Sequence, residues 1–268
     1  MAVLVLNRWL AVVTLAAAGV ASAEAPAWLL QGERLTYTLT YLRVVGGTMV
    51  LQTVPPAEDG LLRFTLQANS SPFVTKFAVV DDFFETTFDP RLSTFLLSRK
   101  ETREGNRHGE ERVEYDPGLG VARRWKNGVA REPIKVAPPV LDTLGAVMVL
   151  RTLPLAPGRA FQLTVLSGKT AYPLVVTVKE RAKIKGAAGV PVETFVVEPR
   201  FREGFLAKKE GKLTLWVTTD ETHVPVKISS ALPFGTLNAS LARVERPWQA
   251  VVESSSGPEK QGKDSHGP

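Results

Sequence analysis

Asp220 and His223 are the residues of this 268-residue chain whose types and spacing come nearest to acid–base chemistry. A carboxylate and an imidazole can act as a general acid–base pair when they converge in a cleft. Asp81 and Asp82 adjoin in an apolar stretch, and two carboxylates held about 5–10 Å apart can hydrolyse a glycoside. Neighbouring strand residues point to opposite faces, however, and both pairs also fit polar turns. A hydrolase that uses these residues is therefore the least favoured of three hypotheses.

The chain lacks the residue patterns of common catalytic and cofactor sites. It has no cysteine, and its histidines, His108, His223 and His266, lack the spacing of zinc ligands. It contains no Gly-x-Ser-x-Gly nucleophile motif, no Walker loop and no dinucleotide fingerprint. We therefore expect no catalytic residue, no metal, no cofactor and no enzymatic activity.

Arg151 lies near the end of an apolar run from Leu141 to Leu153. This run predicts one buried helix near 141–153, with Asp142 capping its start, because apolar residues occur nearly all round it. A guanidinium buried there needs a carboxylate partner, since an unpaired buried charge is costly. We expect a structural ion pair at Arg151, and an anion-binding role inside the sheet is the alternative.

Five phenylalanines between residues 73 and 88 form a second candidate site. Pockets for lipid-like ligands are mostly apolar with a few polar groups, and such a cluster can line their mouth. The core of a β domain is the other place for these rings. The candidate ligand-binding residues are Phe73, Phe77, Phe83, Phe84, Phe88, Arg151 and Trp216.

Strands must position these residues, because alternation of apolar and polar side chains dominates the chain. Between Leu35 and Tyr41 the odd positions are large and apolar and the even positions are threonine. Asn127-Gly128 predicts a two-residue hairpin, and Gly46-Gly47 predicts a bend. About a dozen such strands predict an all-β, mainly antiparallel fold. It would be one large curved sheet, or a partly closed barrel or sandwich, with one helix.

The two ends of the chain differ from its middle. Arg8 precedes an apolar run that ends in the small-residue site Ala21-Ser22-Ala23, so residues 1–23 predict a signal peptide. Residues 24–247 predict a single β-rich domain, and residues 248–268 a disordered tail. The mature protein would be periplasmic or extracellular. It would have no transmembrane anchor and, without cysteine, no lipid attached through one.

Basic residues give the chain a formal net charge of +6. They gather at Arg123, Arg124, Lys126 and Arg131, and again in residues 179–185. Such clusters can meet an anionic lipid head group or glycan, or can be solvated faces of hairpins. The chain has no basic and aromatic recognition motif, and we expect no nucleic-acid partner.

Several segments together form a known pattern. They are Gly32 to Tyr37, the Asp142-Thr-Leu-Gly-Ala segment with Leu150-Arg151, and Trp216 to Asp220 followed by Pro225-Val. Through these segments the chain resembles, over about residues 31–245, the DUF3108 family of exported bacterial proteins of unknown function. The resemblance implies an exported single β domain and supplies no catalytic residues.

The leading hypothesis is a periplasmic, non-catalytic protein that binds a lipophilic or amphipathic envelope molecule on the concave side of its sheet. The second hypothesis is a structural or interaction module, which docks to a protein of an envelope assembly through its basic hairpins or an exposed sheet edge. We expect the binding site in the sheet interior beside Phe77, Phe84 and Arg151.

Overall fold

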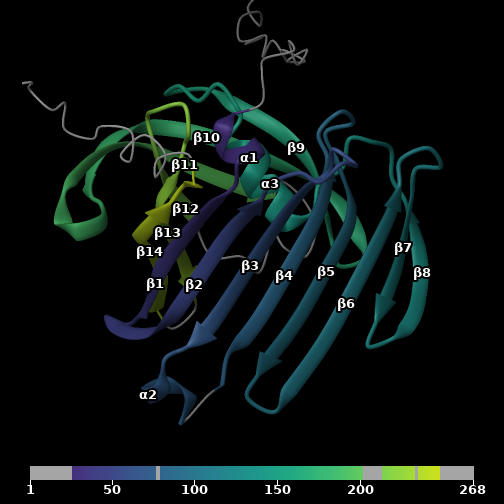
Figure 1. Ribbon diagram of the computed structural model, residues 1–268, viewed down its shortest axis with the longest axis horizontal. Helices are drawn as coiled ribbons and strands as arrows, with labels where there is room; N and C mark the ends of the chain where they lie inside the picture. Colours follow the sequence, from purple (N-terminus) through teal and green to yellow (C-terminus); the bar gives the residue numbers. More distant parts are fainter. Residues whose placement is uncertain (1–25, 77–78, 202–212, 233–234, 248–268) are drawn as a thin grey trace, which may run out of the picture.

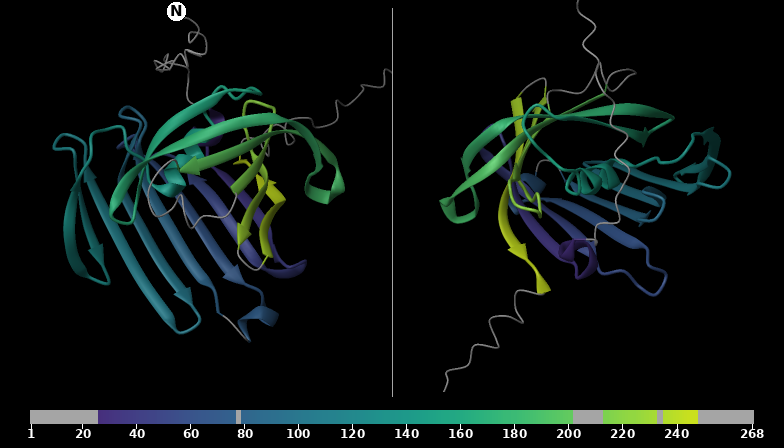
Figure 2. Two further views of the ribbon diagram at one scale, coloured as in Figure 1. Left: turned by 180° about the vertical axis from the view of Figure 1, so that it is seen from behind. Right: turned by 90° about the horizontal axis from the view of Figure 1, so that it is seen from above.

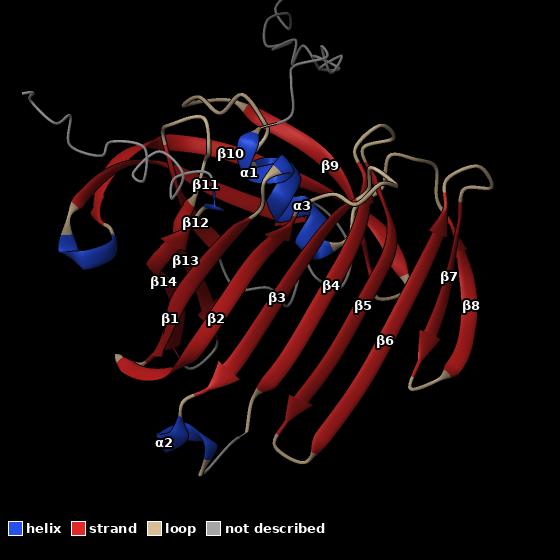
Figure 3. Ribbon diagram, viewed as in Figure 1, coloured by secondary structure: helices blue, strands red, loops and turns tan. Residues whose placement is uncertain are grey.

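A computed structural model of the chain describes residues 26–76, 79–201, 213–232 and 235–247. The expected signal peptide, residues 1–23, and the expected tail, residues 248–268, lie outside the described residues, as does Phe77. Strands dominate the described part, and its helices are short (Figure 3).

Within the described residues, fourteen strands form one antiparallel sheet (Figure 1). The strands are β1 (Glu33–Tyr41), β2 (Val44–Val54), β3 (Leu62–Ser70), β4 (Asp81–Asp89), β5 (Thr94–Glu104), β6 (Arg107–Asp116), β7 (Val121–Lys126), β8 (Val129–Lys135), β9 (Ala160–Ser167), β10 (Thr170–Lys185), β11 (Pro191–Phe201), β12 (Leu213–Thr218), β13 (Pro225–Leu232) and β14 (Gly235–Glu245). The helices are α1 (Ala27–Leu30), α2 (Pro72–Thr75) and α3 (Thr143–Leu150), and a 3₁₀ turn spans Ala187–Gly189.

The order of the strands places the first and last strands side by side in the sheet. From one edge to the other it is β8-β7-β6-β5-β4-β3-β2-β1-β14-β13-β12-β11-β10-β9. Consecutive strands pair as meanders, and β1 pairs with β14 from Arg34 beside Glu245 to Tyr41 beside Leu237. This pairing joins the meander β1–β8 to the meander β9–β14.

The sheet curls around α3, which lies inside the curve (Figure 2). The segment just before α3 spans part of the gap between the edge strands. Leu141 pairs in parallel with Val165 of β9, and the Phe95 N–H of β5 donates to the Val140 carbonyl. Within the described strands β8 and β9 are not paired with each other, so the barrel is partly closed. The predicted all-β, mainly antiparallel fold is confirmed.

Turn chemistry explains the hairpin between β7 and β8. Asn127 and Gly128 have positive φ values of 50° and 73°, as a type I′ turn requires. The hairpin predicted from these two residues is therefore confirmed.

The expected bend at Gly46-Gly47 is wrong, because both residues lie inside β2. The chain reverses at Leu42 and Arg43, whose φ values are 49° and 68°. Gly46 is the extra residue of a bulge against β1. Gly47 meets a close approach from β3, since a Cβ there would lie 2.1 Å from the Asn69 carbonyl oxygen. The two glycines serve strand packing and not chain reversal.

The buried helix predicted near 141–153 is α3, and it is shorter at both ends. Asp142 accepts a hydrogen bond of 2.8 Å from the Gly145 N–H and so caps the helix start, as expected. Leu141 is used for the bridge to β9, and the helix ends before Arg151. Five of the eight helix residues are buried, and they join strands from both meanders in one core. The helix therefore covers part of the inside of the curl with side chains.

Candidate functional site

The concave face carries apolar side chains that keep partial exposure although they pack against the main core. These side chains belong to Leu39, Met49, Leu66, Phe84, Leu213, Ile228 and Leu241. They lie on β1–β4 and on β12–β14, which meet where β1 pairs with β14. Apolar surface that still contacts water is surface that an apolar ligand can cover.

One row of cross-strand neighbours shows where this apolar surface ends. From β2 to β7 the row is Leu51, Leu66, Phe84, Lys100, Glu111 and Lys126. Residues paired directly across strands point to the same face. Lys100 Nζ stands 5.2 Å from the centroid of the Phe84 ring, and Lys126 Nζ forms a 3.0 Å ion pair with Glu111. The row is therefore apolar on β2–β4 and charged on β5–β7.

The phenylalanine cluster is not gathered at one site. Phe88 is buried in the core, and Phe84 lies at its margin on the concave face. Phe83 points to the convex face, because successive strand residues alternate. Phe73 is 64% exposed on α2. Trp216 lies between two core residues of β12 and so faces away from the core.

Arg151 and Glu33 form a buried ion pair at the C-terminal end of α3. Arg151 Nη2 lies 2.7 Å from Glu33 Oε2. Arg246 donates from Nε to the other oxygen of Glu33, also at 2.7 Å. Arg151 Nε donates to the Thr222 carbonyl at 3.1 Å, and its guanidinium carbon stacks 3.7 Å from the centroid of the Trp28 ring. The structural ion pair expected for Arg151 is confirmed.

Several polar atoms around this ion pair have no hydrogen-bond partner among the described residues. They are Trp28 Nε1, Glu33 Oε2, Tyr37 OH, Thr53 Oγ1 and both Nη atoms of Arg151. Arg151 Nη2 and Glu33 Oε2 nevertheless contact each other as an ion pair. Burial lowers the pKa of Arg151, which Glu33 counteracts, and burial raises the pKa of Tyr37.

A hollow of about 340 Å³ adjoins this ion pair, and its lining includes Glu33, Thr53 and Arg246. It is lined by residues of β1 and β2 and by the chain just after β14. The guanidinium of Arg151 already has Glu33 as its counter-ion. Binding of a further anion by Arg151 stays a prediction.

Asp142 is a second buried charge on the inside of the curl. Its carboxylate accepts hydrogen bonds from the Thr86 hydroxyl at 2.6 Å, the Ser98 hydroxyl at 2.7 Å and the Gly145 N–H at 2.8 Å. Burial raises the pKa of this carboxyl, while the hydrogen bonds act in the opposite direction. These contacts tie the start of α3 to β4 and β5.

The acidic residues and the histidine considered for hydrolysis lie on different parts of the sheet. Asp81 and Asp82 begin β4, next to α2, whereas Asp220 and His223 lie in the turn between β12 and β13. Asp220 accepts hydroxyl hydrogen bonds of 2.6 and 2.8 Å from its own turn. His223 Nδ1 lies 2.9 Å from the Arg151 carbonyl oxygen. The fold thus does not bring these four residues together.

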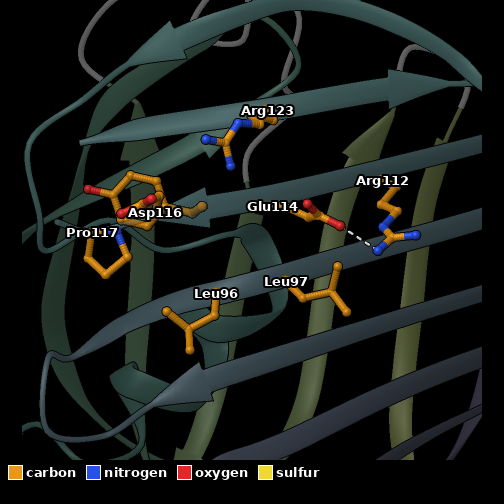
Figure 4. Close-up of a pocket in the computed structure, with 8 residues that line it drawn as sticks. Leu96, Leu97, Arg112, Glu114, Asp116, Pro117 and Arg123 are labelled. Carbon is orange, nitrogen blue, oxygen red and sulfur yellow. Dashed lines mark hydrogen bonds and ion pairs between the residues drawn. The ribbon is translucent and has the colours of Figure 1, made fainter. Parts of the chain in front are cut away.

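The convex face of β5–β7 has two shallow hollows of its own. The larger, of about 440 Å³, is lined by two leucines and by charged residues that include Arg112, Glu114 and Arg123 (Figure 4). Arg112 pairs with Glu114 there. The smaller, of about 320 Å³, adds Trp125, whose ring lies 5.9 Å from the guanidinium carbon of Arg112. The basic cluster at 123–131 is thus divided between the two faces of the sheet.

Sequence reasoning missed the partner of Arg151 and the charged part of the concave face. Glu33 precedes Leu35 and Tyr37 at the same two-residue spacing, so its place on the core face was readable from the alternation. Lys100 lies two residues after Ser98 on β5, so alternation places both side chains on the same face of the strand. No local sequence pattern predicts that Lys100 lies beside Phe84, because this contact depends on how β4 and β5 pair.

These features define the protein as a β-barrel-like domain with a helix inside a partly closed sheet. The chain belongs to the DUF3108 family, described as a protein of unknown function, which matches residues 35–242. The resemblance seen in the sequence is therefore confirmed. A search of the curated proteins finds no match to this chain.

A solved structure shares this architecture. The chain is similar to a β-barrel-like protein of domain of unknown function DUF1849 from Brucella abortus, with a TM-score of 0.61 and 12% identity. That match covers 81% of this chain and 98% of the other, and at such low identity it shows the fold alone. A duf1089 family protein from Pseudomonas aeruginosa matches with a TM-score of 0.32 and 9% identity, over 71% of this chain and 87% of the other.

Two kinds of feature are not found in the described ranges. None of their helices is long and apolar enough to cross a membrane. No group of three or more histidine, aspartate or glutamate side chains in these ranges could hold a metal ion.

Proposed function

We propose that this protein is an exported, non-catalytic binding protein of the cell envelope, and that it holds a lipophilic or amphipathic molecule against the concave face of its sheet. The observation that carries the proposal is the set of partly exposed apolar side chains on β1–β4 and β12–β14, which continues the buried core. Covering about 200 Å² of such surface would contribute about 5 kcal/mol.

The proposed location also limits how the protein could meet a lipid. The signal peptide expected in residues 1–23 would take the chain out of the cytoplasm, and the chain has no cysteine for a lipid anchor. Contact with an envelope lipid would then use the folded surface. The concave face is suited to this contact, because it combines apolar side chains with the charged row that begins at Lys100.

Native mass spectrometry of protein purified from the periplasm tests the proposal. We expect a copurifying amphiphile on the wild-type protein, and its loss from a Phe84→Ser variant. Phe83→Ser is the matched control, because this neighbouring ring points to the convex face. Circular dichroism of both variants checks that they are folded. Protein that carries no amphiphile, and takes up none when refolded with envelope lipids, would overturn the proposal.

A docking role is the second candidate, and the edge strand β8 favours it. Six of its seven residues are exposed, and its outer edge is free of strand pairing in the described sheet. Crosslinking in cells with Arg123→Glu tests this role, because Arg123 is exposed and lines the convex hollow. Loss of a crosslinked protein in Arg123→Glu but not in Arg124→Glu would support docking, and unchanged crosslinks would count against it.

A further inference from the structure

We propose that the ligand of the concave face is an amphiphile with an anionic head group, and that Lys100, Arg124 and Lys126 bind this head group. The inference rests on the proposed function and adds the chemistry of its ligand. A single-chain carboxylate or phosphate monoester has this chemistry.

Two neighbouring rows bring cations to the concave face of β5–β8. Lys100 and Lys126 flank Glu111 in the row that begins with the apolar residues of β2–β4. In the next row Arg124 pairs with Val113 and Val113 pairs with Ser98. Ser98 donates to Asp142 at the start of α3, so this row faces the inside of the curl. The cations therefore share the face that carries the exposed apolar side chains.

Arg124 and Arg131 stand directly opposite each other on β7 and β8. Like charges in such a pair destabilise a sheet. In the described part of the chain, Arg124, Arg131 and Lys100 have no carboxylate within ion-pair distance. An anion bound at this place would relieve the repulsion, which makes the arrangement suited to binding one.

Carboxylates on the concave side compensate only part of this charge. Glu111 pairs with Lys126 at 3.0 Å. Asp82 on β4 accepts a hydrogen bond of 3.1 Å from the Arg103 N–H. Burial raises the pKa of Asp82, and nearby Lys100 acts in the opposite direction. Glu104 of β5 also lies on this face, opposite Arg107 of β6. On β4–β8 the three carboxylates Asp82, Glu104 and Glu111 thus share the face with the five cations Lys100, Arg107, Arg124, Lys126 and Arg131, so the surplus charge is positive.

Two cations on the convex face of the same strands, Arg99 and Arg112, are paired locally. Arg99 pairs with Glu101 on β5, and Arg112 pairs with Glu114 on β6. Each partner lies two residues along the same strand, and both pairs are partly exposed. On the concave face Lys126 pairs with Glu111, whereas Lys100, Arg124 and Arg131 have no carboxylate within ion-pair distance among the described residues.

The apolar half of the concave face, on β1–β4, meets its charged half, on β5–β7, between the neighbouring strands β4 and β5. Lys100 Nζ lies over the Phe84 ring at 5.2 Å, so a cation and an apolar side chain are direct neighbours there. A bound amphiphile would lie across the strands, with its chain over β1–β4 and its head group over β5–β7. Phe84 and Lys100 would then contact the junction of chain and head group.

Binding of three 12-carbon probes to the purified protein tests the inference: dodecyl phosphate, dodecanol and dodecyltrimethylammonium, by isothermal titration calorimetry. We expect dodecyl phosphate to bind most tightly. The variant Lys100→Gln/Arg124→Gln/Lys126→Gln should weaken dodecyl phosphate binding by about tenfold, the combined effect of three partly exposed charge contacts. It should leave dodecanol binding unchanged.

The matched control is Arg99→Gln/Arg112→Gln/Arg123→Gln, which removes three charges from the convex face of the same strands. This variant should bind dodecyl phosphate as the wild type does. Equal loss in both variants, or equal binding of all three probes, would overturn the anionic head group and leave the proposed function standing. Failure of every probe to bind the wild type would overturn both.

Discussion

Arg151 and Glu33 show how a buried charge is tolerated in this protein. The two side chains are buried at the end of α3, where Arg246 and Trp28 also contact them. Moving two charges out of water is costly, and their attraction repays the cost only while both are present. Each residue of the pair therefore stabilises the fold by preventing the other from being buried alone.

Replacement of Arg151 by Met should lower the free energy of unfolding by about 3–5 kcal/mol, because Glu33 would lose its buried partner. Urea denaturation of the wild type and of Arg151→Met measures this difference in the free energy of unfolding. Arg34→Met is the control, since it removes a half-exposed ion pair of 3.6 Å with Glu245 and should cost about 0–1 kcal/mol. Equal losses in the two variants would contradict a structural role for the buried pair.

Asp142 should make stability depend on pH in the direction opposite to most carboxylates. Burial raises its pKa in the folded state, so folding favours the protonated carboxyl. Its contribution is complete below the unfolded pKa of about 4 and is lost as pH rises through the higher folded pKa. The free-energy difference between the wild type and Asp142→Asn should therefore move against the wild type as pH rises above about 4.

Chemical denaturation of the wild type and of Asp142→Asn at several pH values from about 4 upward measures this free-energy difference. Asp89, whose pKa is lowered chiefly by hydrogen bonds from Arg91, acts in the opposite direction but is common to both proteins and cancels. A difference that stays constant with pH would show that Asp142 is not perturbed by burial.

Secondary-structure elements take their shape from a few close contacts. β2 bulges at Gly46, and at Gly47 it lies against β3 more closely than a side chain would allow. α3 is short because Leu141 bonds to β9. The bounds of both elements are thus decided by their neighbours in the sheet.

Gly47→Ala should destabilise the protein by about 1–3 kcal/mol, because its Cβ would lie 2.1 Å from the Asn69 carbonyl oxygen and force β2 from β3. Gly46→Ala is the adjacent control, because the nearest atom to its Cβ would be 3.9 Å away. We expect it to change stability by less than about 0.5 kcal/mol. Thermal unfolding compares the two, and a larger loss for Gly46→Ala would refute the close approach.

The whole molecule depends on β14, which pairs with β1 and joins the two meanders. The core draws residues from strands of both meanders and from α3. Neither meander would therefore keep its buried face covered without the other.

A chain of residues 24–247 keeps β14, and its melting temperature should differ from that of residues 24–268 by no more than about 1–2 °C, because the sequence predicts a disordered tail for the residues removed. A chain that ends at Leu232 lacks β14 and should lose its cooperative thermal transition. Circular dichroism during heating distinguishes these outcomes. Cooperative unfolding of the shorter chain would mean that the meanders are independent units.

The sequence by itself determined the strands, the β7–β8 hairpin and the buried helix, because alternation, turn residues and capping are local signals. It also determined that Arg151 needs a carboxylate partner. Tertiary structure decided that the partner is Glu33, that Phe84 and not Phe83 faces the core side of the sheet, and that Lys100 adjoins Phe84. These relations join segments distant in the chain, and they depend on strand pairing and sheet curvature, which no local pattern specifies.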